Sequence, residues 1–178
     1  MGIFEKKSPC MSRKPWQEQP LRFPKKAIIV MDNQASRAAL CAGLIIQTFS
    51  CQAARAANER DFIRILREAQ REECEIVGII TDDGMEIRGS DLIDAFDGGH
   101  YSQYYQKPKD PDASTTAYLI ITGDQDLNYK GEAGIRKTLV FHLGAWKTFI
   151  NDPSGLAVGI LICSWLGING MSSVRRQA

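Results

Sequence analysis

Three apolar runs of this chain are each followed by acidic residues, and acids in such places can do chemistry. In open α/β sheets, ligands gather in the crevice beyond the carboxyl ends of the strands. Carboxylates that meet there repel one another, and a hard cation such as Mg²⁺ or Mn²⁺ relieves the repulsion. Such a cation can activate water and stabilise a developing phosphoryl charge without a His or Lys base. The acids are Asp32, the pair Asp82 and Asp83, and the pair Asp124 and Asp126.

The same pattern has an ordinary alternative, because Asp and Gly also serve as turn residues after any strand. The dipeptide Asp83-Gly84 is typical of a tight turn, from which residues 85–88 can pair back as a hairpin. Under that interpretation the acids at this turn are not ligands. The candidate catalytic acids that remain are Asp32, Asp124 and Asp126.

The apolar runs themselves are typical of buried strands, and the segments between the early runs are typical of helices. The helical signal is clearest where Asn58 stands in an N-cap position and Phe62, Ile65 and Leu66 recur at helical spacing. This alternation favours an α/β fold. We expect a single α/β domain with a mixed, mostly parallel sheet flanked by helices, whose late strands run either parallel or antiparallel. The expected strands cover residues 25–31, 75–81, 117–122, 138–143 and 156–166, and the expected helices cover 35–49, 58–69 and, after a Ser90 cap, 91–96.

The organisation of the chain is simple. Its 178 residues suffice for one domain with a core. We expect an extended basic N-terminal arm with four prolines over residues 1–24, the domain over 25–170 and a tail over 171–178. Residues 1–26 carry seven Lys or Arg and two Glu, whereas residues 72–97 carry nine Asp or Glu and one Arg. These opposite charges could attract each other or face different partners.

The five cysteines show no CxxC or zinc-ligand spacing, which favours reduced thiols. The first residues contain no apolar stretch typical of a secretory signal. The longest apolar run, residues 156–168, is too short to span a bilayer, so no transmembrane segment is expected. These features predict a cytoplasmic protein.

Several short segments resemble PIN and NYN domain nucleases. Residues 120–127, Ile-Ile-Thr-Gly-Asp-Gln-Asp-Leu, and 133–136, Ala-Gly-Ile-Arg, look like a strand and motif of those families. Residues 30–33 resemble their first-strand acid, and residues 90–95 their mid-chain helix, which supplies another acid. The resemblance covers about residues 25–150 and implies a Rossmann-like sandwich that hydrolyses RNA phosphodiesters with Mg²⁺ or Mn²⁺. The metal ligands it implies are Asp32, Asp91, Asp94, Asp124 and Asp126, of which Asp32, Asp124 and Asp126 are catalytic.

A second group of residues could contact nucleic acid. Aromatic side chains followed by positive charge are a common grip on single strands, and a basic arm can contact phosphates by counterion release. The ordinary alternative is that the tyrosines anchor a long loop to the core and that the arm is solvated. The residues are Tyr101, Tyr104, Tyr105 and Lys107 in the loop, and Lys6, Lys7, Arg13, Lys14, Arg22, Lys25 and Lys26 in or beside the arm.

A second function remains open at this point. The polarised charge, the unusual arm and the lack of a complete catalytic motif are also compatible with a non-enzymatic protein. Such a structural or assembly protein, of the matrix or scaffold type, would self-associate as a homo-oligomer. Its basic arm would bind nucleic acid or a neighbouring subunit.

Overall fold

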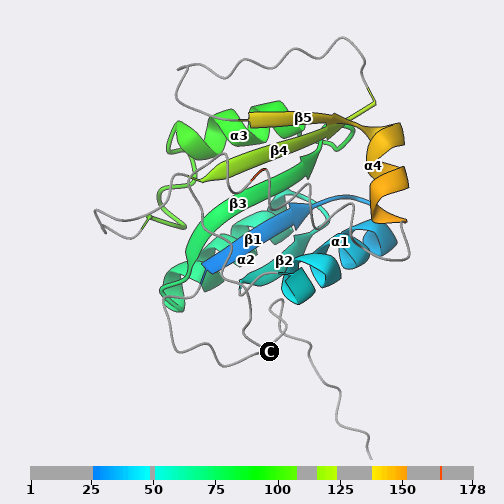
Figure 1. Cartoon of the computed structure of the whole chain (residues 1–178). Coiled ribbons are helices and arrows are strands. Elements are labelled where there is room, and N and C mark those ends of the chain that lie inside the picture. Colours follow the sequence, from blue (N-terminus) through cyan, green and yellow to red (C-terminus); the bar gives the residue numbers. More distant parts are fainter. Residues whose placement is uncertain (1–25, 49–50, 108–115, 124–137, 152–164, 166–178) are drawn as a thin grey trace, which may run out of the picture.

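The computed structural model describes residues 26–48, 51–107, 116–123, 138–151 and Trp165. Within these ranges, five strands form one sheet in the order β2-β1-β3-β4-β5, and all four pairs of neighbours are parallel (Figure 1). The expected α/β fold with a mostly parallel sheet is thus confirmed, and β5 runs parallel to β4. The strands are β1 (Lys26–Met31), β2 (Gln52–Ala56), β3 (Glu75–Asp82), β4 (Ala117–Thr122) and β5 (Thr138–His142).

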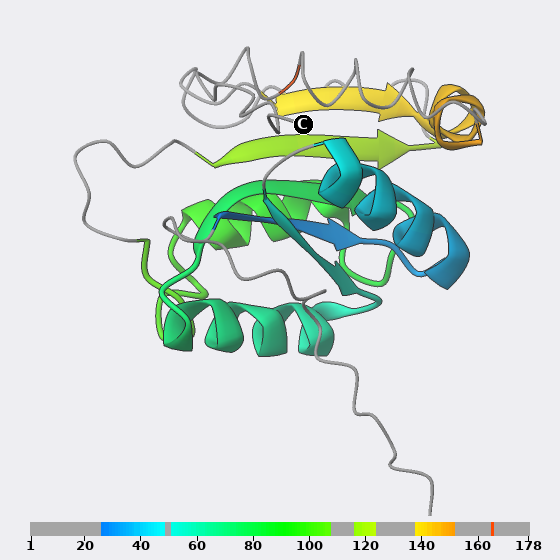
Figure 2. The same ribbon diagram turned by 60° about the horizontal axis from the view of Figure 1, so that its bottom comes forward.

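Helices cover both faces of the sheet, as Figure 2 shows. Two helices, α1 (Ala35–Thr48) and α4 (Leu143–Ile150), lie on one face, and α2 (Glu59–Arg71) and α3 (Gly89–Asp97) lie on the other. Parallel strands need crossover connections, which are almost always right-handed. The chain moves in one direction from β1 to β2 and in the opposite direction from β2 to β3, so α1 and α2 must lie on opposite faces.

The central strands are apolar because both of their faces are covered. All eight residues of β3 and all six of β4 are buried. One core cluster lies between the sheet and the helices α2 and α3, and a second lies between the sheet and α1. In the second cluster, the indole Nε1 of Trp165 donates a hydrogen bond to the backbone carbonyl of Tyr118 at 3.0 Å, and the indole ring packs closely over Gly78.

The start of α2 follows the sequence prediction. The Asn58 side chain accepts a hydrogen bond from the Asp61 backbone N–H at 2.9 Å, which satisfies one of the free N–H groups of the first turn. Phe62, Ile65 and Leu66 are buried against the sheet.

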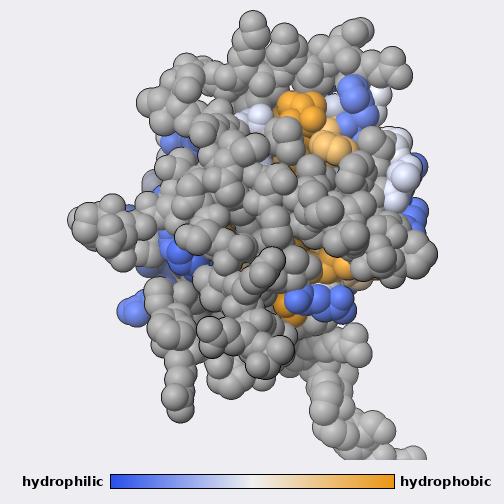
Figure 3. Space-filling view, viewed as in Figure 1, coloured by the Kyte–Doolittle hydropathy of each residue, from blue (hydrophilic) through white to orange (hydrophobic). Residues whose placement is uncertain are grey.

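Of the large hydrophobic side chains in the described ranges, Leu40 on α1 is exposed, at 42%. Figure 3 shows small apolar areas and separate polar areas on the face seen there.

Two local predictions were wrong and one strand was missed. Strand β2 was not predicted, because its Gln-Ala-Ala-Arg-Ala run is short and weakly apolar. Residues 85–88 form no hairpin strand, since the chain turns after β3 and enters α3 at Gly89. The cap of α3 is Arg88, so Ser90 lies inside the first turn instead of preceding it.

Other predictions fall largely outside the described residues. The arm over residues 1–24, the tail over 171–178 and most of the expected strand over 156–166 lie there, although Trp165 itself is helical. None of the helices in the described ranges is both long and apolar enough to cross a membrane.

Candidate functional site

Two carboxylates meet at the carboxyl edge of the sheet, where β1 and β3 end side by side. Met31 pairs with Thr81 in the parallel register of these strands, so Asp32 and Asp82 follow at the same level. The chain leaves β1 toward one face and β3 toward the other, which makes this point the topological switch of the sheet. Ligand sites of open α/β sheets occur at such switch points.

The two acids share one cation, Arg37, from the first turn of α1. Its Nε and Nη2 atoms both donate to the carboxylate of Asp32, the Nη2 bond measuring 2.7 Å, and Nη2 also donates to Asp82. One nitrogen thus bridges the two carboxylates, so the oxygens lie within two hydrogen-bond lengths of each other. We call Asp32, Arg37 and Asp82 the carboxylate–arginine triad.

The triad is buried, with exposed fractions of 3% for Asp32, 5% for Arg37 and 6% for Asp82. Burial lowers the pKa of the Arg37 guanidinium, but the hydrogen bond and charge of Asp32 and then the charge and hydrogen bond of Asp82 outweigh it, so this pKa is raised. A cation in the first turn of a helix also opposes the helix dipole. The two carboxylates compensate for both costs.

One donor of the triad is unused. The Nη1 atom of Arg37 is buried and has no hydrogen-bond partner among the described residues. A buried N–H group without an acceptor costs free energy, because water that would accept its bond is excluded. Nη1 is therefore a donor available to a further anionic oxygen at this edge.

Short turns hold the two acids in place. The Oδ1 atom of Asp32 accepts the backbone N–H of Gln34 at 2.7 Å, and Oδ1 of Asp82 accepts that of Gly84 at 2.9 Å. Each carboxylate thus bonds to the N–H two residues ahead, which is the Asx turn typical of Asp after a strand. Both side chains are fixed before any ligand enters.

Hydroxyl and imidazole groups end the next two strands. Asp82 pairs with Ile121 in the register of β3 and β4, so Thr122 ends β4 one position further on. Thr122 is buried and pairs in turn with His142, an exposed residue at the end of β5. Beside them, the carboxylate of Asp83 lies 3.4 Å from the Ser90 backbone N–H, so this acid faces α3 instead of the triad.

The structure pairs Asp32 with a different acid from the one expected. The strands that precede Asp32 and Asp124 are not neighbours, because β3 lies between β1 and β4. Asp82, which the sequence interpretation set aside as a turn residue, is the acid beside Asp32. Asp124 and Asp126 lie outside the described residues.

The remaining expected metal ligands lie on the opposite face. Asp91 is exposed and Asp94 half-buried on α3, whereas Arg37 and the triad lie on the α1 side. In the part of the chain that the structure describes, no three His, Cys, Asp or Glu side chains form a group that could hold a metal ion. Asp91 and Asp94 are therefore not brought to Asp32.

The expected nucleic-acid residues have varied surroundings. Tyr101 and Tyr105 are buried: the Tyr101 hydroxyl donates to Glu59 at 2.7 Å, and the Tyr105 hydroxyl accepts the Ile76 backbone N–H at 2.9 Å. These two tyrosines anchor the loop, as the ordinary alternative held. Tyr104 is half-buried, and Lys107 is exposed. Lys26 lies 3.8 Å from Glu75, and the six other basic residues of the arm lie outside the described ranges.

Searches by sequence and by structure gave different outcomes. No protein-family model matches the chain, and no curated protein matches it. The chemotaxis protein CheY4 of Vibrio cholerae matches in structure with a TM-score of 0.52 and 12% identity, over 80% of this chain and 99% of that chain. The chain has a CheY-like fold.

Two further solved structures match less well. A response regulator receiver domain protein from Bacillus halodurans has a TM-score of 0.42 and 14% identity, over 72% of this chain and 96% of its own. A response regulator protein from Burkholderia pseudomallei, with a phosphorylated aspartic acid and a calcium ion, has a TM-score of 0.41 and 15% identity, over 80% of this chain and 75% of its own.

These findings correct the expected functions. The ribonuclease prediction was wrong, because the fold resembles that of the chemotaxis protein CheY4 and because the strand ends meant to unite Asp32 and Asp124 are not adjacent. The expectations of a hydrolase and of magnesium as a nuclease cofactor fail with it. The expectation of a matrix-type assembly protein was also wrong, since the matching solved structure is that of the chemotaxis protein CheY4. The one implication of the nuclease resemblance that the structure confirms is the α/β sandwich.

A divalent cation remains compatible with this edge of the sheet. Asp32 and Asp82 offer carboxylate oxygens, which Mg²⁺ and Ca²⁺ prefer, on adjacent strand ends. In the structure, Arg37 binds these same oxygens. A cation and the guanidinium would therefore compete for one pair of carboxylates.

Proposed function

We propose that this chain is a receiver-like signalling module that accepts a phosphoryl group on Asp82. The observation that carries the proposal is the position of this residue. Asp82 ends the central strand at the topological switch point, and its carboxylate contacts a guanidinium that keeps a spare N–H donor. The CheY-like fold supports the same conclusion at the level of fold.

The chemistry requires little from the protein besides position and charge. A carboxylate oxygen of Asp82 would attack the phosphorus of a small phosphodonor, and the bond from phosphorus to the donor's leaving oxygen would break. The product is an acyl phosphate on the side chain. Phosphoryl transfer depends chiefly on positioning and on stabilising the charge of the phosphoryl oxygens.

Arg37 is the residue that would supply this stabilisation. Its Nη1 can donate to a phosphoryl oxygen without giving up either existing carboxylate contact. Guanidinium groups suit phosphate because their donors form a planar fork. The phosphoryl group would draw Arg37 toward itself, and α1, which carries Arg37, is the element that would report the modification.

A divalent cation would enter this scheme at Asp32 and Asp82. Bound there, it would neutralise the carboxylates and withdraw negative charge from the entering phosphoryl group. Because Arg37 holds both acids, we expect weak binding of Mg²⁺ and Ca²⁺ to the native protein and tighter binding to Arg37→Met. Calorimetric titration with each ion tests this expectation. Equal affinity in both proteins would contradict the competition, and Asp83→Asn is the control that should change nothing.

The test of the proposed function is covalent labelling of the full chain. The protein is incubated with acetyl phosphate, and intact mass spectrometry follows the gain of one phosphoryl group. We expect labelling of the native protein and of Asp83→Asn, and none of Asp82→Asn. Asp83 is the matched control because it is the adjacent acid and contacts Ser90 instead of Arg37. Labelling that survives in Asp82→Asn, or no labelling of any protein, would overturn the proposal.

A further inference from the structure

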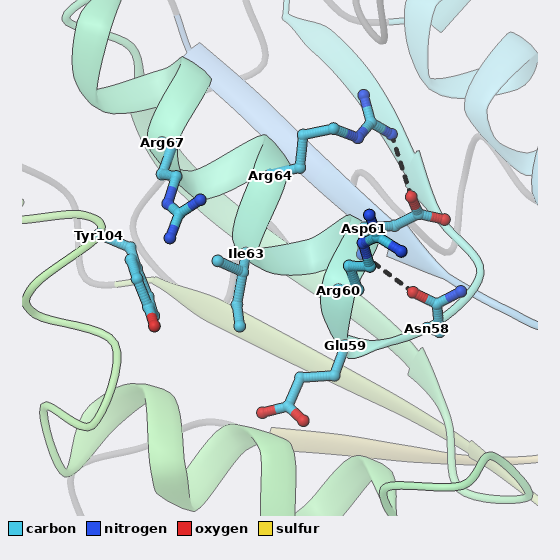
Figure 4. Close-up of a pocket in the computed structure, with 8 residues that line it drawn as sticks. All are labelled: Asn58, Glu59, Arg60, Asp61, Ile63, Arg64, Arg67 and Tyr104. Atoms are coloured by element: carbon cyan, nitrogen blue, oxygen red, sulfur yellow. Dashed lines mark hydrogen bonds and ion pairs between the residues drawn. The ribbon is translucent and has the colours of Figure 1, made fainter.

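An open groove of about 740 Å³ runs along the outer side of α2 and ends at the loop after α3. Figure 4 shows the residues that line it, with Tyr104 from the loop facing Arg67 of the helix. Arg60, Ile63, Arg64 and Arg67 recur at helical spacing, so they form one stripe on α2. We call this surface the α2 groove.

The α2 groove is lined by three arginines and two acids, which leaves a net positive charge among the described residues that form it. Its two acids are already engaged, since Asp61 lies 3.3 Å from Arg64 and Glu59 accepts the Tyr101 hydroxyl. Arg60 and Arg67 are exposed, and neither forms a hydrogen bond or an ion pair with any described residue. Two guanidinium groups are thus available to an anionic ligand.

The groove suits a peptide better than a nucleic acid. A base needs an open aromatic face for stacking. The guanidinium of Arg67 already covers the ring of Tyr104, with its carbon 4.7 Å from the ring centre, while Tyr101 and Tyr105 are in the core. The half-buried side chain of Ile63 adds an apolar contact between the charges, which an apolar side chain of a peptide can cover.

The spacing of the charges sets the form of the peptide. Arg60 and Arg67 are seven residues apart on a helix, which corresponds to about 10 Å along the axis. Three residues of a peptide in the extended polyproline II conformation span about 9 Å, at about 3.1 Å each, and three residues per turn put positions i and i+3 on the same side. Acids three positions apart would therefore reach both arginines together, with the intervening residues above Ile63.

We propose that the α2 groove binds an acidic, extended peptide segment of a partner protein. Arg60 and Arg67 pair with two acids of the segment, and Ile63 contacts an apolar residue between those acids. This site goes beyond the proposed function, because it lies on the opposite side of the sheet from Arg37 and does not require modification of Asp82.

Fluorescence anisotropy of a labelled synthetic peptide tests the site with the full chain. The probe carries Glu residues three apart with a Leu between them, and a second probe carries Lys in place of each Glu. We expect saturable binding of the acidic probe that weakens with salt. Arg60→Glu and Arg67→Glu should each lower the affinity by about tenfold, the effect of losing one charge-assisted pair. Arg67→Lys, which keeps the charge but not the planar fork, should lose less.

The control variant is Arg55→Glu, which makes the same change of charge at an exposed arginine of β2 outside the groove. It should bind the acidic probe as the native protein does. A loss as large as that of Arg67→Glu would show non-specific attraction and overturn the proposal. So would absence of binding, equal binding of the Lys probe, or tighter Arg67-dependent binding of a single-stranded RNA oligomer.

Discussion

Arg37, in the first turn of α1, forms an ion pair with Asp82 at the end of β3, 45 positions later in the chain. This ion pair links the segment after β1 to the central strand β3. The same nitrogen of Arg37 also donates a hydrogen bond to Asp32. Since all three groups are buried, each depends on the others for its charge balance.

The carboxylate–arginine triad should stabilise the fold only while it is complete. Removing one partner of a buried ion pair leaves an uncompensated charge and typically costs about 3–5 kcal/mol. We expect Arg37→Met to lower the free energy of unfolding by that amount, measured by urea denaturation. The triple variant Asp32→Asn, Arg37→Met, Asp82→Asn should regain most of the loss, because no charge is left unpaired. A loss below about 1 kcal/mol in Arg37→Met, as for a surface pair, would contradict this account.

Replacing Gly78 or Gly43 by alanine should change the stability of the fold in opposite directions. A Cβ at Gly78 in β3 would lie 2.8 Å from Cη2 of Trp165, so Gly78→Ala should cost about 1–3 kcal/mol through overpacking. A Cβ at Gly43, inside α1, meets nothing within 4 Å. Gly43→Ala should therefore stabilise the protein by about 0.5–1 kcal/mol, because glycine disfavours a helix. Thermal unfolding of the two variants measures both effects, and a stabilising Gly78→Ala would refute the contact with Trp165.

Tyr105 should make the protein less stable at high pH. Burial raises the pKa of its phenol to about 12, although the hydrogen bond from Ile76 acts in the opposite direction. Below the ordinary tyrosine pKa of about 10, the phenol is protonated in both the folded and unfolded states. Between pH 10 and pH 12 only the unfolded state ionises, so the free energy of unfolding should fall with rising pH across that window.

Denaturation series at stepped pH values measure this dependence. Tyr105→Phe removes the titrating group and should show a shallower decline, from a lower starting stability because the Ile76 N–H loses its acceptor. Burial also raises the pKa of Tyr101, with the same sign, so part of the decline should remain. An unchanged slope in Tyr105→Phe would mean that this phenol is not buried as described.

Cys41 should be unreactive in the folded protein. Burial, followed by the negative charge of Asp32, raises the pKa of its thiol to about 12, and the thiolate is the reactive form. We expect iodoacetamide at neutral pH to leave Cys41 unmodified until urea unfolds the chain, as peptide mapping would show. Phosphorylation that moves α1 should increase this reactivity, because Cys41 lies one turn after Arg37. Rapid modification of the native, unphosphorylated protein would contradict the burial of α1.

The fold could be predicted where the sequence pattern is local and strong. β3 and β4 are continuous apolar runs because both of their faces are covered, and α2 has a cap and a clear apolar stripe. β2 could not be predicted, because this edge strand consists mostly of small residues and lacks the continuous apolar run that marks a buried strand. Strand order is set by packing across the whole domain, so the sequence did not reveal that β3 separates β1 from β4.

The candidate site shares Asp32 with the sequence prediction and differs in its other members. The structure places Asp32 at the carboxyl edge of the sheet, and its function there stays a prediction. Asp82 was set aside because Asp83-Gly84 resembles a hairpin turn. In the structure the chain enters α3 at Gly89 after this turn and forms no second hairpin strand. Arg37 was missed, although the sequence offers a signal for its pairing with Asp32. The acid ends a strand, and the arginine follows five residues later in the first turn of a helix.

The measurement that tests the central claim most directly is the location of the phosphoryl group. The native chain is treated with acetyl phosphate, and borohydride reduction then converts an aspartyl phosphate to homoserine, which tandem mass spectrometry locates in the peptide that spans β3 and its turn. We predict homoserine at Asp82, with Asp32 and Asp83 unchanged. Homoserine at Asp83 or Asp32, or none in this protein after treatment, would contradict the assignment of Asp82 as the acceptor.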